Sequence, residues 1–215
     1  LYTPDNTVIA VAGNIDHKAV TDMISKYFEI EVKEKAYNFK LFEKKDGGRV
    51  YLKDKKTEQA HVAIGFPGYA EENKDHWALK LLAVILGGNM SSRMFLGVRE
   101  AKGLSYYIHT STDNYMDGGV IVTNAGVDLS RIDEAVSGII AEYKKVKDED
   151  VPEAELKKSK AYLKGKMVLS LEDCEEFAHL LAKYELLHKA AKDPEEIMKL
   201  IDEVKVADIR RVAKD

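Results

Sequence analysis

The sequence predicts an α+β fold, an α/β sandwich in which a mainly antiparallel sheet is backed by helices. Short β-rich and alternating runs lie within the first 125 residues, with helical patterns between them. From residue 130 onward the apolar residues follow helical spacing throughout. The order of elements is therefore strands, helix, strands and then helices, without the regular β–α–β alternation that a parallel sheet requires.

Composition sets the broad class of the protein. A chain of 215 residues with 45% hydrophobic and 33% charged residues is typical of an ordinary globular protein with a real core. The net charge of −4, with both signs interspersed, predicts no nucleic-acid partner. No apolar run approaches the roughly 20 residues that span a bilayer, so no membrane association is expected. The single Cys174 excludes an intrachain disulfide and favours a reducing compartment, so we expect a cytoplasmic location.

The first 47 residues divide into a strand, a helix and a linker. Thr7–Ala12, TVIAVA, predicts a buried strand, and Asp16 is a suitable N-cap for a helix through Phe28. Residues 29–47 are charged and aperiodic and end in Asp46-Gly47-Gly48. This segment is the best candidate for a boundary between two structural units.

Four further runs predict the sheet. Their residues alternate in polarity or are β-branched, and turn residues bound them. Pro67-Gly68 closes the second run, and Asp117-Gly118 joins the last two as an antiparallel pair. The runs are residues 49–54, 59–66, 105–112 and 119–125.

Helical spacing of apolar residues and start signals predict the helices. Ser130 is read as an N-cap, Pro152 as a first helical residue, and Asp193-Pro194 as a cap with proline. The helices are residues 74–86, 130–147, 152–169, 173–189 and a last one from 193. Because the chain opens without Met and stops within a helical pattern, we expect it to be a piece of a longer polypeptide.

Residues 86–107, LGGNMSSRMFLGVREAKGLSYY, organise the rest of the chain. They predict a glycine-broken helix end, a short amphipathic helix capped by Ser91-Ser92, a stop at Gly103 and then a strand. Arg99 then lies on the last helical turn and Tyr106 at the start of the strand, so both side chains could project toward a common point. The alternative is structural: Arg99 pairs with Glu100 or caps carbonyls, and Tyr106 packs.

Other candidate chemistry in the sequence is weak. None of the six histidines lies in an H-x-x-E-H, H-E-x-x-H or C-x-x-C setting, so no metal site is predicted in this chain. Gly87-Gly88 precedes a helix but lacks the Lys-Ser/Thr ending of a phosphate-binding loop. We interpret the glycine pair as a close backbone turn that joins two helices.

The run GGNMSSRMFLGVREAKGLSYYI resembles the second half of the pitrilysin/insulinase-type zinc metallopeptidases, the inverted-motif enzymes. In that family the stretch reads Ser-Ser-Arg-Leu/Met-Phe, then Arg-Glu-x-x-Gly-Leu-x-Tyr. Arg99 and Tyr106 match its arginine and tyrosine, and Ser92, Arg93 and Gly103-Leu104 match the residues around them. Similarity elsewhere is supportive and collinear over nearly the whole chain.

The resemblance implies a domain organisation. Residues 1–34 would be the tail of the preceding half-domain, 35–47 a linker, and 48–215 the inactive, peptidase-like C-terminal domain without its last strand. A missing strand leaves an open sheet edge. That edge could pair with a second copy, giving a homodimer, or be filled by Thr7–Ala12.

The resemblance also implies a function. The family hydrolyses peptide bonds with a zinc ion held by H-x-x-E-H, which this chain lacks. We therefore expect an inactive chain without a cofactor, with zinc in a partner half on the same polypeptide or a separate subunit. Arg99 and Tyr106 would reach across to the peptide substrate, supported by Ser92, Arg93, Gly103 and Leu104.

Two other interpretations stay open at this point. The chain could be a structural or assembly subunit, like the core proteins of the respiratory cytochrome complex, which resemble the same family but have lost catalysis. It could also be a free-standing peptide-binding module. Retention of both Arg99 and Tyr106 favours the peptidase interpretation, because a scaffold has no need of that pair.

Overall fold

The computed structural model describes residues 3–28, 50–53, 60–190 and 192–215. The chain forms two compact units, one of Leu1–Lys40 with Lys164–Lys199 and one of Leu41–Leu163 with Leu200–Asp215. The predicted linker, residues 35–47, and the predicted domain limits at 34 and 48 lie outside the described residues. The stretch 86–107 lies wholly within the second unit.

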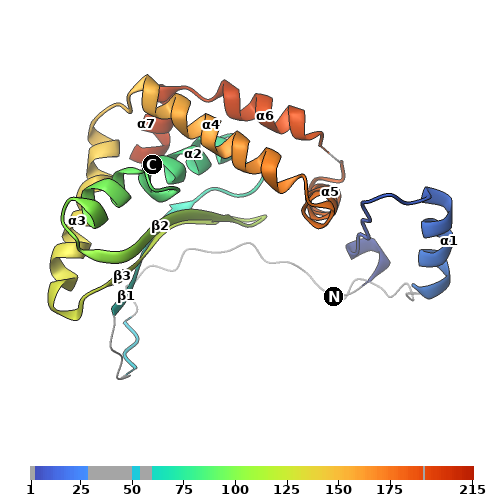
Figure 1. Ribbon diagram of the computed structural model, residues 1–215, viewed down its shortest axis with the longest axis horizontal. Helices are drawn as coiled ribbons and strands as arrows, with labels where there is room; N and C mark the ends of the chain where they lie inside the picture. Colours follow the sequence, from blue (N-terminus) through green and yellow to red (C-terminus); the bar gives the residue numbers. More distant parts are fainter. Residues whose placement is uncertain (1–2, 29–49, 54–59, 191) are drawn as a thin grey trace. The chain divides into compact units, whose positions relative to one another are not determined.

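The second unit contains an antiparallel sheet, which confirms the predicted fold class (Figure 1). Its strands are β1 (Ala60–Gly68), β2 (Ser105–Asn114) and β3 (Gly119–Val127), in the order β1-β3-β2. A tight connection joins β2 to β3, where the Tyr115 amide donates to the Gly118 carbonyl at 2.7 Å. Three of the predicted strands are confirmed, each running two residues further than expected.

Helices cover one face of this sheet (Figure 1). Helix α2 (His76–Gly87) packs on β2 and β3, and α7 (Val206–Lys214) packs against α2 and α3 (Ile132–Asp148). On β2 and β3 the side chains that point toward the helices are buried, whereas on β1 those of Val62 and Ile64 are half-buried. The opposite face is mostly exposed or half-buried, as the period of two along a strand requires. The largest fully buried side chains include Leu81, Ile85, Leu86, Leu104, Ile139 and Ile209.

The first unit contains η1 (Pro4–Asn6), α1 (His17–Tyr27) and α5 (Cys174–His188). The boundary between the units falls within α4 (Glu153–Ser170) and α6 (Pro194–Glu203). Asp16 caps α1 as predicted, since its Oδ1 accepts a hydrogen bond from the Ala19 amide at 2.7 Å.

Two predicted strands are wrong. Thr7–Ala12 forms no strand, and Ile9 and Val11 are exposed rather than buried. In the predicted strand 49–54, the described residues 50–53 have no regular structure, and their side chains are exposed. A short run with strand propensity needs a neighbouring strand to complete its backbone hydrogen bonds. Neither run has such a neighbour among the described residues.

Two differences between the predicted and the observed helices have a clear physical cause. Ser130 does not cap α3; Asp128 Oδ1 accepts from the Ser130 amide and hydroxyl, which starts the short helix η3 (Leu129–Arg131) before α3. A carboxylate accepts hydrogen bonds more strongly than a hydroxyl, so the aspartate takes this role. The predicted last helix divides into α6 and α7, with Lys205 in an extended conformation between them.

Gly87 is required where α2 crosses β2. A Cβ atom at this position would overlap the hydroxyl and backbone nitrogen of Thr110, and backbone cannot yield as a flexible side chain does. We expect Gly87→Ala to lower the free energy of unfolding by about 1–3 kcal/mol in urea titrations. Gly165 in α4 has open space around it, so Gly165→Ala should raise that free energy by about 1 kcal/mol. Equal stability of Gly87→Ala and the wild type would contradict this packing.

Asp208 stabilises the N-terminal end of α7. It accepts from the Lys205 amide at 2.9 Å and from Arg211 at 2.7 Å, and both interactions hold its pKa below the ordinary 3.8. Because the folded pKa is below the unfolded one, the carboxylate stabilises the fold above pH 3.8, and this stability is lost as the pH falls through the folded pKa. We expect Asp208→Asn to be less stable than the wild type at neutral pH and equally stable at about pH 2. Urea unfolding at both pH values checks this.

Candidate functional site

A glycine turn connects α2 to the candidate site, as predicted. The Gly88 amide donates to the Val84 carbonyl at 3.1 Å, ending α2, and the Tyr162 hydroxyl donates to the Gly88 carbonyl at 3.1 Å. The next residues form a compact turn centred on Asn89. Its Oδ1 accepts from the amide and the hydroxyl of Ser91, each at 2.8 Å.

The prediction that Ser91-Ser92 cap the next helix is wrong. The buried Ser92 hydroxyl donates to the Asn89 carbonyl at 2.6 Å instead of accepting from a helical amide. Asn89 stabilises the turn because its side-chain carbonyl accepts both hydrogen bonds from Ser91, two residues later in the chain. The Ser92 hydroxyl therefore closes this turn.

The helix that carries Arg99 is η2 (Phe95–Glu100), a π-helix. Its wider winding is visible at the end, where the Ala101 amide donates to the Leu96 carbonyl, five residues earlier. Gly97 permits this geometry against α3, because a Cβ there would lie 3.1 Å from Glu142 Oε1. Single turns of π-helix are rare and often occur at functional sites. The sequence predicted the helix without its π geometry.

Gly103 ends η2 as predicted. Its φ of +57° lies in the left-handed region, which favours glycine. The Gly103 amide donates to the Arg99 carbonyl at 2.9 Å, and the Leu104 amide donates to the Val98 carbonyl at 3.1 Å. Leu104 is buried, so it anchors the chain in the core immediately before β2 begins.

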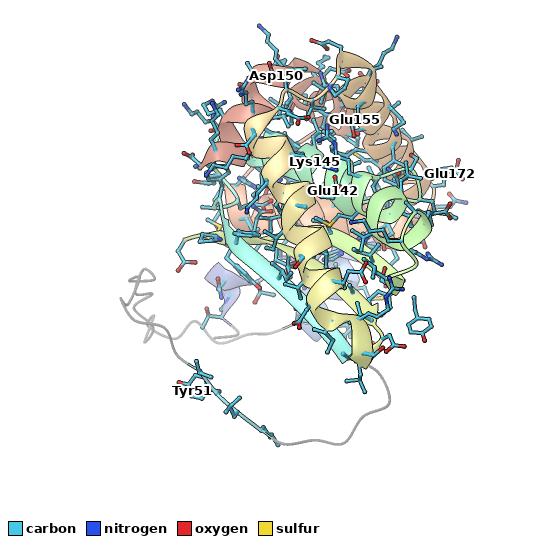
Figure 2. The ribbon with its side chains drawn as sticks, turned by 90° about the vertical axis from the view of Figure 1, so that its left-hand side faces the viewer. Tyr51, Glu142, Lys145, Asp150, Glu155 and Glu172 are labelled. Carbon is cyan, nitrogen blue, oxygen red and sulfur yellow. The ribbon has the colours of Figure 1, made fainter. Side chains whose placement is uncertain are left out.

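Arg93 holds the beginning of η2 in place. Its Nε donates to Glu155 Oε1 at 3.0 Å and its Nη2 to Glu155 Oε2 at 2.7 Å, a bidentate pair that is largely buried. The hydrogen bond to Glu155 also raises the pKa of Arg93. Figure 2 labels Glu155 on α4 and, on α3, Glu142 with Lys145, which donates to it at 2.6 Å. The Arg93 guanidinium is thus engaged by Glu155 and links the beginning of η2 to α4.

Arg99 is exposed at the end of η2. Its guanidinium carbon lies 4.7 Å from the centre of the Phe95 ring, a cation–π contact that holds the side chain along the helix. Among the described residues it forms no ion pair, so the expected structural alternative, a pair with Glu100, is not observed. The guanidinium donors of Arg99 therefore face solvent.

A β-bulge presents Tyr106. Ser105 lies opposite Val127 and Tyr107 opposite Gly126, so Tyr106 is an extra residue in β2 without a partner on β3. Its side chain is 61% exposed. No hydrogen bond or ring contact to the Tyr106 side chain occurs among the described residues. The phenol hydroxyl is therefore free to donate to a ligand.

A small cavity of about 150 Å³ adjoins Tyr106. Arg131 lines it and donates to the carbonyls of Lys102 and Gly103 at 3.2 and 3.3 Å, which fixes the turn between Arg99 and Tyr106. Asp128 also lines the cavity, and the Ser130 hydroxyl holds the pKa of its carboxyl below the usual range. Sequence reasoning missed Asp128 and Arg131, although Asp-x-Ser before a helix is a known capping pattern.

The structure brings Arg99 and Tyr106 to the two ends of one turn, residues 101–104, and leaves both exposed. No bond joins the two side chains within the part of the chain that the structure describes. The second unit is thus an antiparallel sheet backed by helices, with Arg99 and Tyr106 exposed at the two ends of one turn.

The comparison with known sequence families shows the family to which the chain belongs. Residues 1–163 match the family described as the peptidase M16 inactive domain, and the chain belongs to that family. The resemblance to the pitrilysin/insulinase-type zinc metallopeptidases is thereby confirmed.

Proteins similar in sequence to this chain are named zinc proteases. The chain is 33% identical over 221 residues to an uncharacterized zinc protease of Streptomyces coelicolor, covering 100% of this chain and 48% of that protein. It is 34% identical over 212 residues to the zinc protease YmxG of Bacillus subtilis, covering 98% of this chain and 50% of that protein. The chain thus spans about half the length of the curated relatives it matches.

Solved structures share the fold. A protease from Helicobacter pylori superposes with a TM-score of 0.82 and 26% identity, covering 94% of this chain and 50% of that protein. Within the described ranges of this chain, no group of three or more His, Cys, Asp or Glu side chains is placed to hold a metal ion. None of the described helices combines the length and apolar character needed to cross a membrane.

Proposed function

We propose that this chain is the substrate-binding, transition-state-assisting half of a zinc metalloendopeptidase that hydrolyses peptides or unfolded proteins. One observation carries the proposal: an exposed tyrosine that bonds to no other described residue projects from a β-bulge, one turn away from an exposed arginine. The Arg-Glu-x-x-Gly-Leu-x-Tyr motif of the family falls on these residues, Arg99 and Tyr106.

Tyr106 acts as a hydrogen-bond donor in this proposal. Hydrolysis builds negative charge on the oxygen of the scissile carbonyl, and a phenol donor aimed at that oxygen binds more strongly in the transition state than in the ground state. The phenol must already be oriented before the reaction, because reorienting it would offset the free energy by which it stabilises the transition state. The buried Leu104 and the β2–β3 ladder hold the backbone on both sides of Tyr106.

Arg99 binds a backbone carbonyl of the peptide. A guanidinium offers several donors in a planar fork and remains charged at all physiological pH values. Its stem lies along η2 because the guanidinium contacts the Phe95 ring, so few conformations are lost when a peptide binds. The Arg93–Glu155 pair and the Asn89 turn fix η2 itself.

The metal and the catalytic base belong to another half in this proposal. A half that bears H-x-x-E-H, on the same polypeptide or as a separate subunit, would supply zinc and the attacking water. This chain alone is then inactive. A homodimer formed through an open sheet edge and a cytoplasmic location stay predictions.

The scaffold interpretation has no support from the site. A structural subunit has no need of this pair, which is exposed here, with Tyr106 bonded to no other described residue. The sequence encoded next to this chain discriminates the interpretations. An H-x-x-E-H motif there, in the same or an adjacent reading frame, supports catalysis.

The test of the proposal is cleavage of a quenched fluorescent peptide. This chain is assayed alone, with its H-x-x-E-H-bearing half and zinc, and that half is assayed alone as the second control. We expect cleavage only with both halves present. Binding of the two halves without cleavage would favour the scaffold, and zinc-dependent cleavage by this chain alone would overturn the proposal.

A further inference from the structure

Tyr107, the residue after the bulge, makes a contact across the open face of the sheet. It lies in register with Gly126 on β3, and Gly126 lies in register with His61 on β1. The Tyr107 hydroxyl reaches over Gly126 to His61 Nδ1 at 3.1 Å. Three residues on three strands thus form one row, with the tyrosine ring spanning the middle strand.

Glycine is necessary at the centre of this row. A Cβ atom on Gly126 would lie 2.5 Å from Cε1 and 2.9 Å from Cδ1 of the Tyr107 ring, so any larger residue would push the ring away. The ring therefore lies directly against the backbone of β3. The hydrogen bond to His61 fixes its far end, and the ring centres of Tyr107 and His61 are 6.2 Å apart.

This row fixes the residue that directly follows the bulge. Tyr106 projects from the bulge, and Tyr107 is the next residue in β2. Side chains on one face of a sheet are held by what they meet on that face. Tyr107 meets Gly126 and His61, so its position in β2 is held on the C-terminal side of Tyr106.

We propose that His61, Gly126 and Tyr107 form a clamp that sets the direction of Tyr106. Tyr107 and His61 are positioning residues: they touch no reacting atom and act through the tyrosine beside them. The clamp holds Tyr107 over Gly126 and therefore restrains the backbone on the C-terminal side of the bulge from which Tyr106 projects. This inference rests on the proposed function of Tyr106.

The expected effects are on turnover rather than on binding. Tyr107→Phe removes the hydrogen bond and keeps the ring, and His61→Ala removes the same bond from the other side. Each should lower kcat of the two-half enzyme by about 5–10-fold with little change in KM, because a displaced catalytic group loses rate steeply. Gly126→Ala expels the ring and should lower kcat by about 30–100-fold. His61→Asn keeps an acceptor near the position of Nδ1 and should restore most of the rate.

A matched control lies on the same face of the sheet. His109 is an exposed histidine on β2, in register with Asn124 rather than Gly126, and it contacts neither Tyr107 nor His61 in the described part of the chain. His109→Ala should leave kcat unchanged. Thermal unfolding of each variant separates a local effect from loss of the fold, and Tyr107→Phe keeps the test open should Gly126→Ala fail to fold.

The decisive experiment is a double-mutant cycle with the enzyme that carries both halves. If the clamp acts through Tyr106, then Tyr107→Phe lowers kcat in the wild type and has no further effect in Tyr106→Phe. Equal losses in both backgrounds would overturn the clamp and leave the proposed function standing. If Tyr106→Phe by itself leaves kcat unchanged, the proposed function fails, whatever the clamp variants do. The two failures are therefore distinguishable.

Discussion

Replacing Tyr106 by phenylalanine should lower kcat of the two-half enzyme by about 10²–10³-fold, the loss typical of removing one oxyanion donor. The substitution removes a hydroxyl that bonds to no described residue, from a side chain that is 61% exposed. We therefore expect the melting temperature and KM to stay close to the wild-type values. Steady-state cleavage of a fluorescent peptide measures both constants.

A second exposed tyrosine, beyond the other end of β2, provides the control for this prediction. Tyr115, in the connection between β2 and β3, is 64% exposed, about as much as Tyr106. Tyr115→Phe should leave kcat unchanged. If the two variants lose activity equally, the effect is a general one of surface tyrosines, and the role given to Tyr106 is wrong.

Breaking the Arg93–Glu155 pair should have the largest effect on stability. Two hydrogen bonds, at 3.0 and 2.7 Å, join the side chains. The Arg93 side chain is 17% exposed and the Glu155 side chain is 19% exposed. Removal of one partner leaves the other charge poorly solvated. We expect Glu155→Leu to lower the free energy of unfolding by about 3 kcal/mol, measured by urea denaturation.

The paired substitution separates charge from packing. Arg93→Met together with Glu155→Leu removes both charges and keeps apolar volume, so most of the lost stability should return. The exposed pair of Lys18 and Asp22 is a suitable control, because its loss should change stability by less than about 1 kcal/mol. A double variant as unstable as Glu155→Leu would show that the geometry of the ion pair, rather than its isolated charge, supports η2.

Local signals in the sequence predicted much of the fold. Asp16 and Asp173 cap α1 and α5 through bonds to amides two or three residues away, and such short-range chemistry is readable from sequence. Strands are different, because they require a partner elsewhere in the chain. Thr7–Ala12 has strand composition but gains no ladder among the described residues, so its prediction failed.

The candidate site was predictable in its residues and not in its geometry. The motif placed Arg99 and Tyr106 at the two ends of one turn. The π-helix and the bulge are invisible in sequence, since one follows from the approach of Gly97 to Glu142 and the other from register with β3. Glu155, the partner of Arg93, lies 62 residues later in the chain, and no sequence pattern near either residue predicts the pair.

The measurement that tests the account most directly is the affinity of two matched peptides for the two-half enzyme. One carries a tetrahedral phosphinate in place of the scissile bond, and the other carries a non-hydrolysable planar mimic. We expect Tyr106→Phe to weaken the phosphinate by about the same factor as kcat/KM and to leave the planar peptide unchanged. Equal weakening of both, or of neither, would contradict the claim that Tyr106 stabilises the transition state.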